Sequence, residues 1–193
     1  MTQVYKLTIY TFCGNHRDKG EALLREAVKI FAYENQIVPA IEANSLLLGK
    51  TKNGKPYFRG LPINFSISHT GRLWGCLISF SNVGFDIQEK RELDFNRLAA
   101  RFFHEKEMNY VRNVGLDGFF DIWVRKEACV KYHGAKLISD IRSFSVVRDG
   151  KLTEKTEYKG GLCFVNPVEL GSAVKCAYCS GSEGAEVRIK ELK

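Results

Sequence analysis

Three short apolar segments that follow one another closely constrain the fold of this chain most strongly. They span residues 63–68, 73–80 and 83–87, and their length and composition are typical of β-strands. Polar turns separate them, with His69-Thr70-Gly71 in the first gap and Ser81-Asn82 in the second. Strands this close together favour hairpins over alternating βαβ units.

The rest of the chain mixes helices with further strands. We expect a strand over residues 4–12, a helix over 19–32, a helix capped by Asp94, a longer helix from about Asp117 to Tyr132 ended by Gly134, a hairpin around Asp149-Gly150 and a strand over 173–179. Helices and strands alternate irregularly, so the predicted fold class is α+β.

Length and composition limit the domain organisation. The 193 residues, 45% of them hydrophobic, suffice for one large domain or two small ones that share a core. The turn at Ser81-Asn82 divides the chain into an N-terminal half, residues 1–82, and a C-terminal half, residues 83–193. No apolar run reaches the roughly 18 residues of a membrane span, and residues 1–12 alternate like a strand rather than a signal peptide.

The six cysteines are spread along the chain, which is typical of reduced thiols and predicts a cytoplasmic location. Cys176 and Cys179 have the spacing of a zinc-binding pair, but the sequence offers no second pair. Because a zinc ribbon needs four ligands, we interpret this segment as a buried strand.

The net charge of +7 favours an anionic ligand or an acidic protein partner. A basic nucleic-acid-binding module is an alternative, but no basic stripe with interleaved aromatic residues and no standard binding motif is present. Gly49-Lys50-Thr51 matches only the end of a phosphate-binding loop, and Asn44 stands where that motif needs a glycine. We therefore expect neither a nucleic-acid partner nor a nucleoside triphosphatase.

The long predicted helix carries a stripe of chemically active side chains. At 3.6 residues per turn, Trp123, Glu127 and Lys131 share one stripe, and Lys126 lies beside it. Glu127 and Lys131 could simply form a surface ion pair worth a few tenths of a kcal/mol. The apolar flank of the stripe indicates instead that it faces a protected cleft.

Two apolar strands end in polar groups. His69, beside Ser68, can donate a hydrogen bond to a phosphate oxygen, although a single histidine there is more often structural. Asp86 and Gln88 are two residues apart, so their side chains face the same way. Oxygen ligands on one face suit Mg²⁺; a capped strand end is the alternative.

Together these segments resemble one family, the 4′-phosphopantetheinyl transferases of the surfactin-synthetase-activating type. The matching pieces follow the family's order: Gly54-Lys55-Pro56, residues 65–71 (FSISHTG), residues 83–87 (VGFDI), residues 100–103 (ARFF) with Glu107, and residues 123–131 (WVRKEACVK). Each piece alone has little specificity, whereas the spaced set is highly specific. The resemblance covers nearly the whole chain and fades before Arg17 and after Gly150.

The resemblance implies an activity and a fold. Members of the family transfer phosphopantetheine from coenzyme A to a serine of an acyl or peptidyl carrier protein, and they require Mg²⁺. Their fold is a pseudo-dimer of two similar α+β halves with the active site in the cleft between them. The family type is usually monomeric, and its carrier proteins are typically acidic, which agrees with the positive net charge.

The resemblance also implies roles for particular residues. Asp86, Glu127 and Gln88 would bind Mg²⁺, and Glu127 would be the base, directly or through a metal-bound water. Lys126 and Lys131 would lie near the pyrophosphate and act in catalysis, with Lys131 stabilising or protonating the departing 3′,5′-ADP. The coenzyme A site would contain Lys55, Pro56, Ser68 and His69, together with Arg17, or alternatively Lys19, at the 3′-phosphate.

The chain departs from the family pattern in two places. Gln88 stands where the family usually has a glutamate, so the third metal ligand would be a neutral amide. The basic stretch that normally precedes the first helix is missing. A homologue that binds carrier proteins with little or no catalysis is therefore a further alternative, and turnover of coenzyme A to 3′,5′-ADP would distinguish the enzyme from it.

Overall fold

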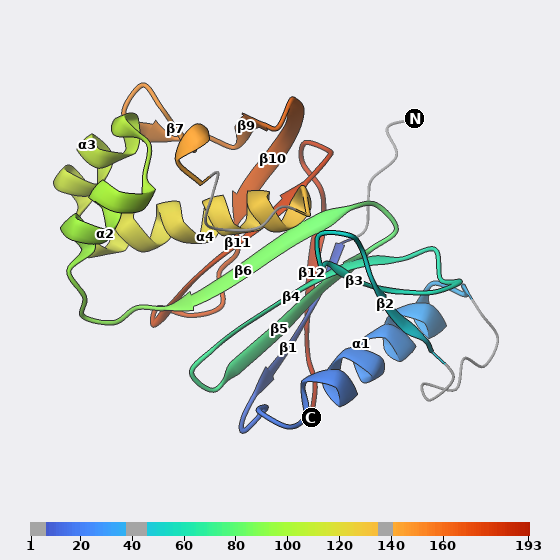
Figure 1. The fold of residues 1–193 in the computed structure, drawn as a ribbon. Coiled ribbons are helices and arrows are strands. Elements are labelled where there is room, and N and C mark those ends of the chain that lie inside the picture. Colours follow the sequence, from blue (N-terminus) through green and yellow to red (C-terminus); the bar gives the residue numbers. More distant parts are fainter. Residues whose placement is uncertain (1–6, 38–45, 135–140) are drawn as a thin grey trace.

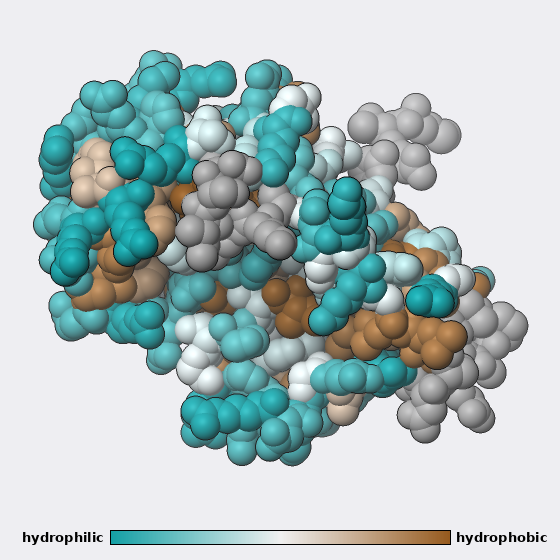
Figure 2. All heavy atoms as spheres, in the orientation of Figure 1, coloured by the Kyte–Doolittle hydropathy of each residue, from teal (hydrophilic) through white to brown (hydrophobic). Residues whose placement is uncertain are grey.

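The computed structural model describes residues 7–37, 46–134 and 141–193. Two four-stranded sheets lie side by side, each with a long helix packed on one face (Figure 1). Hydrophilic residues cover most of the end of the molecule that carries α2 and α3, whereas hydrophobic residues gather over the region of β2 and α1 (Figure 2). Within the described ranges, no helix combines the length and the apolar character that crossing a membrane requires.

The first sheet has the order β12-β1-β5-β4, with β12 (Val187–Glu191), β1 (Leu7–Cys13), β5 (Leu73–Ser79) and β4 (Asn64–Thr70). β12 runs parallel to β1, and the other pairs are antiparallel. Helix α1 (Gly20–Glu34) packs on this sheet through its apolar face, because Leu24, Val28 and Phe31 recur at helical spacing and are buried. A hairpin of β2 (Leu48–Lys50) and β3 (Pro56–Phe58) joins α1 to β4.

The second sheet is antiparallel and has the order β6-β11-β10-β9, with β6 (Val83–Glu89), β11 (Val174–Ser180), β10 (Gly161–Pro167) and β9 (Lys155–Tyr158). Helix α4 (Leu116–Tyr132) lies across it (Figure 1). The outer elements are α2 (Phe95–Phe102), α3 (Glu105–Val114), a 3₁₀ turn (Ile141–Ser143), β7 (Val147–Arg148) and β8 (Lys151–Leu152).

Helix α4 approaches β6 at Gly84. A Cβ atom added to Gly84 would lie 1.9 Å from the backbone oxygen of Ala128 and 2.5 Å from the backbone nitrogen of Tyr132. Backbone atoms in the middle of a packed helix cannot move aside, so only glycine fits at this position. The contact fixes the height of α4 above the strand that carries Asp86.

The two sheets meet where β4 and β6, the edge strands, lie against each other. Hydroxyl oxygens of β4 accept hydrogen bonds from backbone N–H groups of β6: Ser66 from Phe85 at 3.0 Å, Ser68 from Ile87 at 3.2 Å, and Thr70 from Glu89 at 3.1 Å. We call this junction the seam. Side chains, rather than a backbone ladder, satisfy these N–H groups of the second sheet.

Much of the predicted organisation is confirmed. The three apolar segments form β4, β5 and β6, and the α+β class is correct. Asp94 caps α2, where it accepts a hydrogen bond from the backbone of Arg97 at 3.1 Å. The Asp149-Gly150 turn connects β7 to β8. Of the strand expected over residues 4–12, the part from residue 7 onward lies in β1, and residues 4–6 lie outside the described ranges.

The structure differs from the predictions at three elements. Helix α4 begins at Leu116, so Asp117 lies within its first turn instead of capping it, and forms an ion pair with Lys90 at 3.1 Å. Helix α3 was not expected. The last strand, β12, pairs with β1 of the first sheet, so both ends of the chain contribute to that sheet. The division into residues 1–82 and 83–193 stays a prediction.

Candidate functional site

Asp86 is the centre of a polar group at the seam. Its side chain is 3% exposed, and its Oδ1 atom accepts hydrogen bonds from Ser68 Oγ and from Lys131 Nζ, both at 2.7 Å. Its Oδ2 atom accepts a longer hydrogen bond from the amide of Gln88 at 3.3 Å. The side chains of Asp86 and Gln88 on β6 therefore point in the same direction, as expected. Ser68, expected at a coenzyme A phosphate, instead orients the Asp86 carboxylate.

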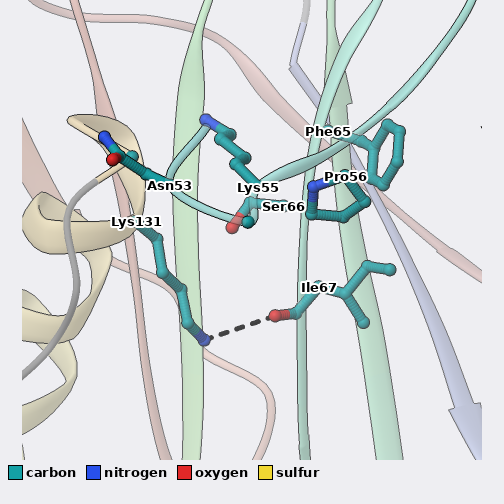
Figure 3. A pocket seen from close by; sticks show the side chains of 9 residues that line it. Asn53, Lys55, Pro56, Phe65, Ser66, Ile67 and Lys131 are labelled. Carbon is teal, nitrogen blue, oxygen red and sulfur yellow. Dashed lines mark hydrogen bonds between the residues drawn. The ribbon is translucent and has the colours of Figure 1, made fainter. Parts of the chain in front are cut away.

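Lys131 links the helix to both sheets. Besides Asp86, its Nζ atom donates to the backbone oxygen of Phe85 on β6 at 3.0 Å and to that of Ile67 on β4 at 3.3 Å. Figure 3 shows the side chain reaching from α4 toward Ile67. The side chain is 30% exposed and lines the adjoining hollow.

Glu127 lies one helical turn before Lys131 and is 6% exposed. The pKa of Glu127 is raised to about 8, mainly by burial and also by the negative charge of Asp86, while Lys131 acts in the opposite direction. Two desolvated carboxylates this close destabilise each other when both are ionised, so a positive charge beside them is favourable. This donor set, with the amide of Gln88 beside it, fits a hard divalent cation such as Mg²⁺.

Lys126, the neighbour of Glu127, lies in the interior and not in this polar group. Its side chain has 0% exposure, and its ammonium group donates to Glu107 Oε1 at 2.9 Å and to the backbone oxygen of Phe144. Burial lowers the pKa of Lys126, and the charge of Glu107 opposes this shift. The expected position of Lys126 near a pyrophosphate does not fit this arrangement, because its ammonium group is buried and already paired.

A hollow of about 250 Å³ opens beside Lys131. It is lined by the loop and strand around Lys55 and Pro56, by β4 and by the end of α4 (Figure 3). Lys55 donates to the side chain of Asn82 at 2.7 Å and to the backbone oxygen of Val83 at 2.8 Å. Burial lowers the pKa of Lys55 to about 8. The structure thus brings Lys55, Pro56 and Lys131 around one cavity, and their role in binding coenzyme A stays a prediction.

A second hollow, of about 370 Å³, lies at the end of β1 and is lined by His16, Arg17 and Arg72 together with Gly14, Asn15 and Gly71. His69 is exposed here, and its ring lies 5.2 Å from that of His16, measured between centroids. His16 also contacts the backbone oxygen of Gly71 at 3.2 Å. Arg17 lines this hollow, whereas Lys19 immediately precedes α1 and is not among its lining residues.

A third hollow, of about 390 Å³, lies between the second sheet and helices α2 and α4. Its walls are largely apolar, with Leu93, Leu98, Phe119, Phe120 and Trp123, and Arg91, Gln88 and Glu127 complete the lining. Glu127 therefore lines this hollow, while Lys131, one turn later, lines the first one.

Two residues at the site, His16 and Ser66, were not predicted as site residues. The pairing of Glu107 with Lys126, which lies outside the site, was not predicted either, because it depends on how α3 packs on α4. The alternation of Ser66, Ser68 and Thr70 on β4 is the signal that could have predicted a hydrogen-bonding edge.

Comparison with known proteins adds an independent result. The family model described as the 4′-phosphopantetheinyl transferase superfamily matches residues 82–179, which include β6, α4 and β11. The chain is 33% identical over 172 residues to 4′-phosphopantetheinyl transferase gsp of Aneurinibacillus migulanus, covering 86% of this chain and 70% of that protein.

Two further relatives carry the same description. The chain is 27% identical to 4′-phosphopantetheinyl transferase psf-1 of Bacillus pumilus, over 90% of this chain and 74% of that protein. It is 26% identical to 4′-phosphopantetheinyl transferase Sfp of Bacillus subtilis, over 72% of this chain and 65% of that protein. This chain belongs to the 4′-phosphopantetheinyl transferase superfamily.

Proposed function

We propose that this protein transfers 4′-phosphopantetheine from coenzyme A to a serine of an acyl or peptidyl carrier protein and releases 3′,5′-ADP. The observation that carries the proposal is the group formed by Asp86, Glu127 and Lys131, in which two desolvated carboxyl groups and one ammonium group meet between two hollows of different character. One hollow contains the basic side chains of Lys55 and Lys131, and the other is lined by several aliphatic and aromatic side chains together with Arg91, Gln88 and Glu127.

The basic hollows suit the two charged ends of coenzyme A. Lys55 and Lys131 line the cavity beside the carboxylates and can hold the pyrophosphate. Arg17, His16 and His69 lie at the end of β1, where they can hold the 3′-phosphate. Lys126 has no place in this binding scheme, since its ammonium group is enclosed with Glu107.

We assign a Mg²⁺ site to Asp86, Glu127 and Gln88. Oxygen donors with net negative charge suit this ion, and the two buried carboxyl groups of Asp86 and Glu127 supply that charge. When bound, Mg²⁺ would neutralise charge on the phosphate oxygens. The amide of Gln88 can supply an oxygen if its side chain rotates away from the hydrogen bond with Asp86.

The reaction exchanges one phosphorus–oxygen bond for another. The serine Oγ atom forms a bond to the phosphorus that carries pantetheine, and the bond from that phosphorus to the bridging oxygen of the pyrophosphate breaks. The bond electrons leave with 3′,5′-ADP, and Lys131 can stabilise the negative charge that develops there. The serine proton passes to Glu127, a carboxylate one helical turn from Lys131 that is suited to act as general base.

The apolar hollow gives the carrier protein a route to Glu127. Leu93, Leu98 and Trp123 can pack against an apolar surface of the partner, and Arg91 can pair with an acidic residue there. A serine inserted along this route would reach Glu127, which lines this hollow.

We further propose that the two sheets with their helices are the halves of a pseudo-dimer and that the active site lies between them. Residues from β4, β6 and α4 all contribute to the Asp86 group, which supports this reading. A monomeric state, a cytoplasmic location and the lack of a nucleic-acid partner stay predictions.

The decisive experiment mixes the protein with coenzyme A, Mg²⁺ and an apo carrier protein, using one acyl and one peptidyl carrier. We expect the mass of the carrier to increase by one phosphopantetheine group and 3′,5′-ADP to appear in equal amount. Coenzyme A binding without turnover on either carrier would identify a binding homologue instead, and the absence of both would refute the proposal.

A further inference from the structure

A cluster of three buried thiols lies where α4 packs on the second sheet. Cys129 is on α4, Cys163 on β10 and Cys179 on β11, and all three have 0% exposure. Their Sγ atoms all lie within 4.8 Å of one another, and those of Cys129 and Cys163 are 3.9 Å apart. Side chains from a helix and two strands thus converge on one point.

The geometry of the cluster is close to that of a metal site. Zinc–sulfur distances of about 2.3 Å in a tetrahedral site place the sulfur atoms about 3.8 Å apart. The distance between Cys129 and Cys163 already matches this separation, and the remaining sulfur–sulfur distances need to shorten by about 1 Å at most. Rotation about χ1 and small backbone shifts supply movements of this size.

His133 offers a fourth ligand beside the thiols. It is the C-cap residue of α4, and its ring meets that of Tyr158 edge-on with 5.2 Å between centroids. Its Nε2 atom is buried and has no hydrogen-bond partner within residues 7–37, 46–134 and 141–193. A buried imidazole nitrogen without a partner is costly, and coordination of an ion would remove that cost.

Burial raises the pKa values of Cys129 and Cys179 well above the usual value, whereas that of Cys163 is lowered. Hydrogen bonds with Cys129 and Cys179 lower the pKa of Cys163, and His133 lowers it further. Thiolates are the form of cysteine that binds metals. Ordinary buried cysteines behave as small apolar side chains, and Cys76, which is fully buried in the first sheet, is an example for comparison.

We propose that Cys129, Cys163 and Cys179, together with His133, form a site for one thiophilic divalent ion such as Zn²⁺. This site is distinct from the oxygen donors of Asp86 and Glu127, because sulfur ligands select soft ions and carboxylates select Mg²⁺. Cys129 lies between Glu127 and Lys131 on α4. An ion at the cluster would therefore tie the helix that carries both residues to β10 and β11.

The test uses the full chain, reduced and freed of metals by a chelator, with Co²⁺ as the spectroscopic probe. Three thiolates around Co²⁺ produce intense sulfur-to-metal charge-transfer absorption, which oxygen ligands do not. We expect this absorption to saturate at one Co²⁺ per chain, to persist in excess Mg²⁺ and to disappear when Zn²⁺ displaces the probe. Saturation without charge-transfer absorption would place the ion at the carboxylates and overturn the proposal.

Variants locate the site. Cys163→Ala should lower the affinity for Zn²⁺ at least about 100-fold, and His133→Ala about 10- to 100-fold, the range that supporting residues of metal sites show. Cys76→Ala, the matched loss of an equally buried thiol, should leave the affinity unchanged, as should Cys13→Ser at the exposed thiol. If the affinity for Zn²⁺ is unchanged in Cys163→Ala but lost in Cys13→Ser, the proposal is overturned.

A measurement on the unmodified protein covers the case in which Cys163→Ala does not fold. X-ray absorption at the zinc edge of the protein loaded with one equivalent of Zn²⁺ should show three sulfur neighbours at about 2.3 Å and one nitrogen. A first shell of oxygen and nitrogen alone would refute the site, whatever the behaviour of the variants.

Discussion

Glu107 and Lys126 form an ion pair with 2.8 Å between Oε2 and Nζ, and neither side chain is exposed to solvent. Glu107 also accepts hydrogen bonds from the backbone N–H groups of His104 at 2.8 Å and Val146 at 2.8 Å. One carboxylate therefore joins α3, α4 and the segment before β7. Removing either residue would leave a buried charge without its partner, which is not the case for a surface ion pair.

Replacing Lys126 should accordingly affect stability. Lys126→Met leaves the carboxylate of Glu107 buried without its counter-ion, which typically costs about 3–5 kcal/mol of unfolding free energy. Lys175→Met removes a partly exposed ion pair with Asp121 and should cost about 1 kcal/mol or less. Urea denaturation of the three proteins measures both effects. A stable Lys126→Met protein with weakened coenzyme A binding would instead place Lys126 at the phosphates.

Glu127 should govern both turnover and the pH dependence of stability. Glu127→Gln should abolish turnover while coenzyme A still binds, because it removes the base and a metal ligand but few phosphate contacts. Glu26→Gln, at an exposed position on α1, is the control. Calorimetric binding and carrier modification separate the two effects. Turnover within threefold of the unmodified protein, about 0.7 kcal/mol, would exclude Glu127 as the base.

The raised pKa of Glu127 also has a consequence for folding. Between the ordinary pKa of 4.5 and the folded-state value of about 8, the folded protein binds more protons at Glu127 than the unfolded chain does. The contribution of this group to stability must therefore fall as pH rises through that window. Metal-free Glu127→Gln should lack this contribution. Denaturation at several pH values in a chelating buffer tests this, and parallel profiles for the two proteins would contradict it.

Gly84→Ala should displace α4. The added methyl group would overlap the backbone of Ala128, so we expect a loss of about 3 kcal/mol, the upper end of typical overpacking costs. Because α4 carries Glu127 and Lys131, turnover should also fall. Gly20→Ala, where an added Cβ has its nearest neighbour at 4.0 Å, is the control. Thermal unfolding and carrier modification measure the two effects, and equal stability of both variants would contradict the close contact.

Lys55 and His69 should contribute mainly to binding. Lys55→Ala and His69→Ala should each raise the KM for coenzyme A about tenfold, the effect of losing 1.4 kcal/mol of interaction, and change kcat less. Lys52→Ala provides the matched control, since Lys52 is exposed in the same turn and does not line the cavity. Steady-state kinetics at a saturating concentration of carrier protein measure KM and kcat for each variant. An unchanged KM in both variants would remove these residues from the coenzyme A site.

Gln88 should determine how strongly the binding of Mg²⁺ and the binding of coenzyme A depend on each other. With a neutral amide in place of a carboxylate, the free protein should hold Mg²⁺ weakly, and the pyrophosphate should strengthen the binding; couplings of about 5- to 150-fold are typical. Gln88→Glu should tighten Mg²⁺ in the free protein and reduce the coupling. Calorimetric titration of Mg²⁺ with and without a non-reactive coenzyme A analogue measures both. Equal affinities in the two proteins would place Gln88 outside the influence of the ion.

Local patterns were sufficient to predict much of the fold. The segments that became β4, β5, β6 and α4 are apolar runs bounded by turn residues, so short-range preferences and burial agree. β12 was not predicted although Val187-Arg188-Ile189-Lys190 alternates, because the strand is short and its partner, β1, is far away in the sequence. Pairing over such a distance depends on the shape of the whole sheet.

The side chains of the site were predictable only where spacing fixed their direction. Glu127 and Lys131 share a stripe because they are four residues apart, and the structure places both at the carboxylate group. Lys126 is rotated about 100° from Glu127 on a helix, and that direction leads to Glu107 on α3. Cys129, Cys163 and Cys179 have no mutual periodicity, so only the packing of α4 on β10 and β11 brings them together.

The seam between β4 and β6 also determines how the molecule can deform. A backbone ladder fixes the separation of two strands, since each N–H group and its carbonyl partner are covalently rigid. Here the two sheet edges are held by hydroxyl groups on rotatable side chains, and turning such a rotamer by about 30° costs only about 0.5–1.5 kcal/mol. The seam thus joins the two four-stranded sheets through side chains, while a shared apolar core with Leu77 of β5 and Phe85 of β6 packs them together. Asp86 and Lys131 lie at this junction, so any shift of one sheet against the other must be transmitted to the charged group that they form.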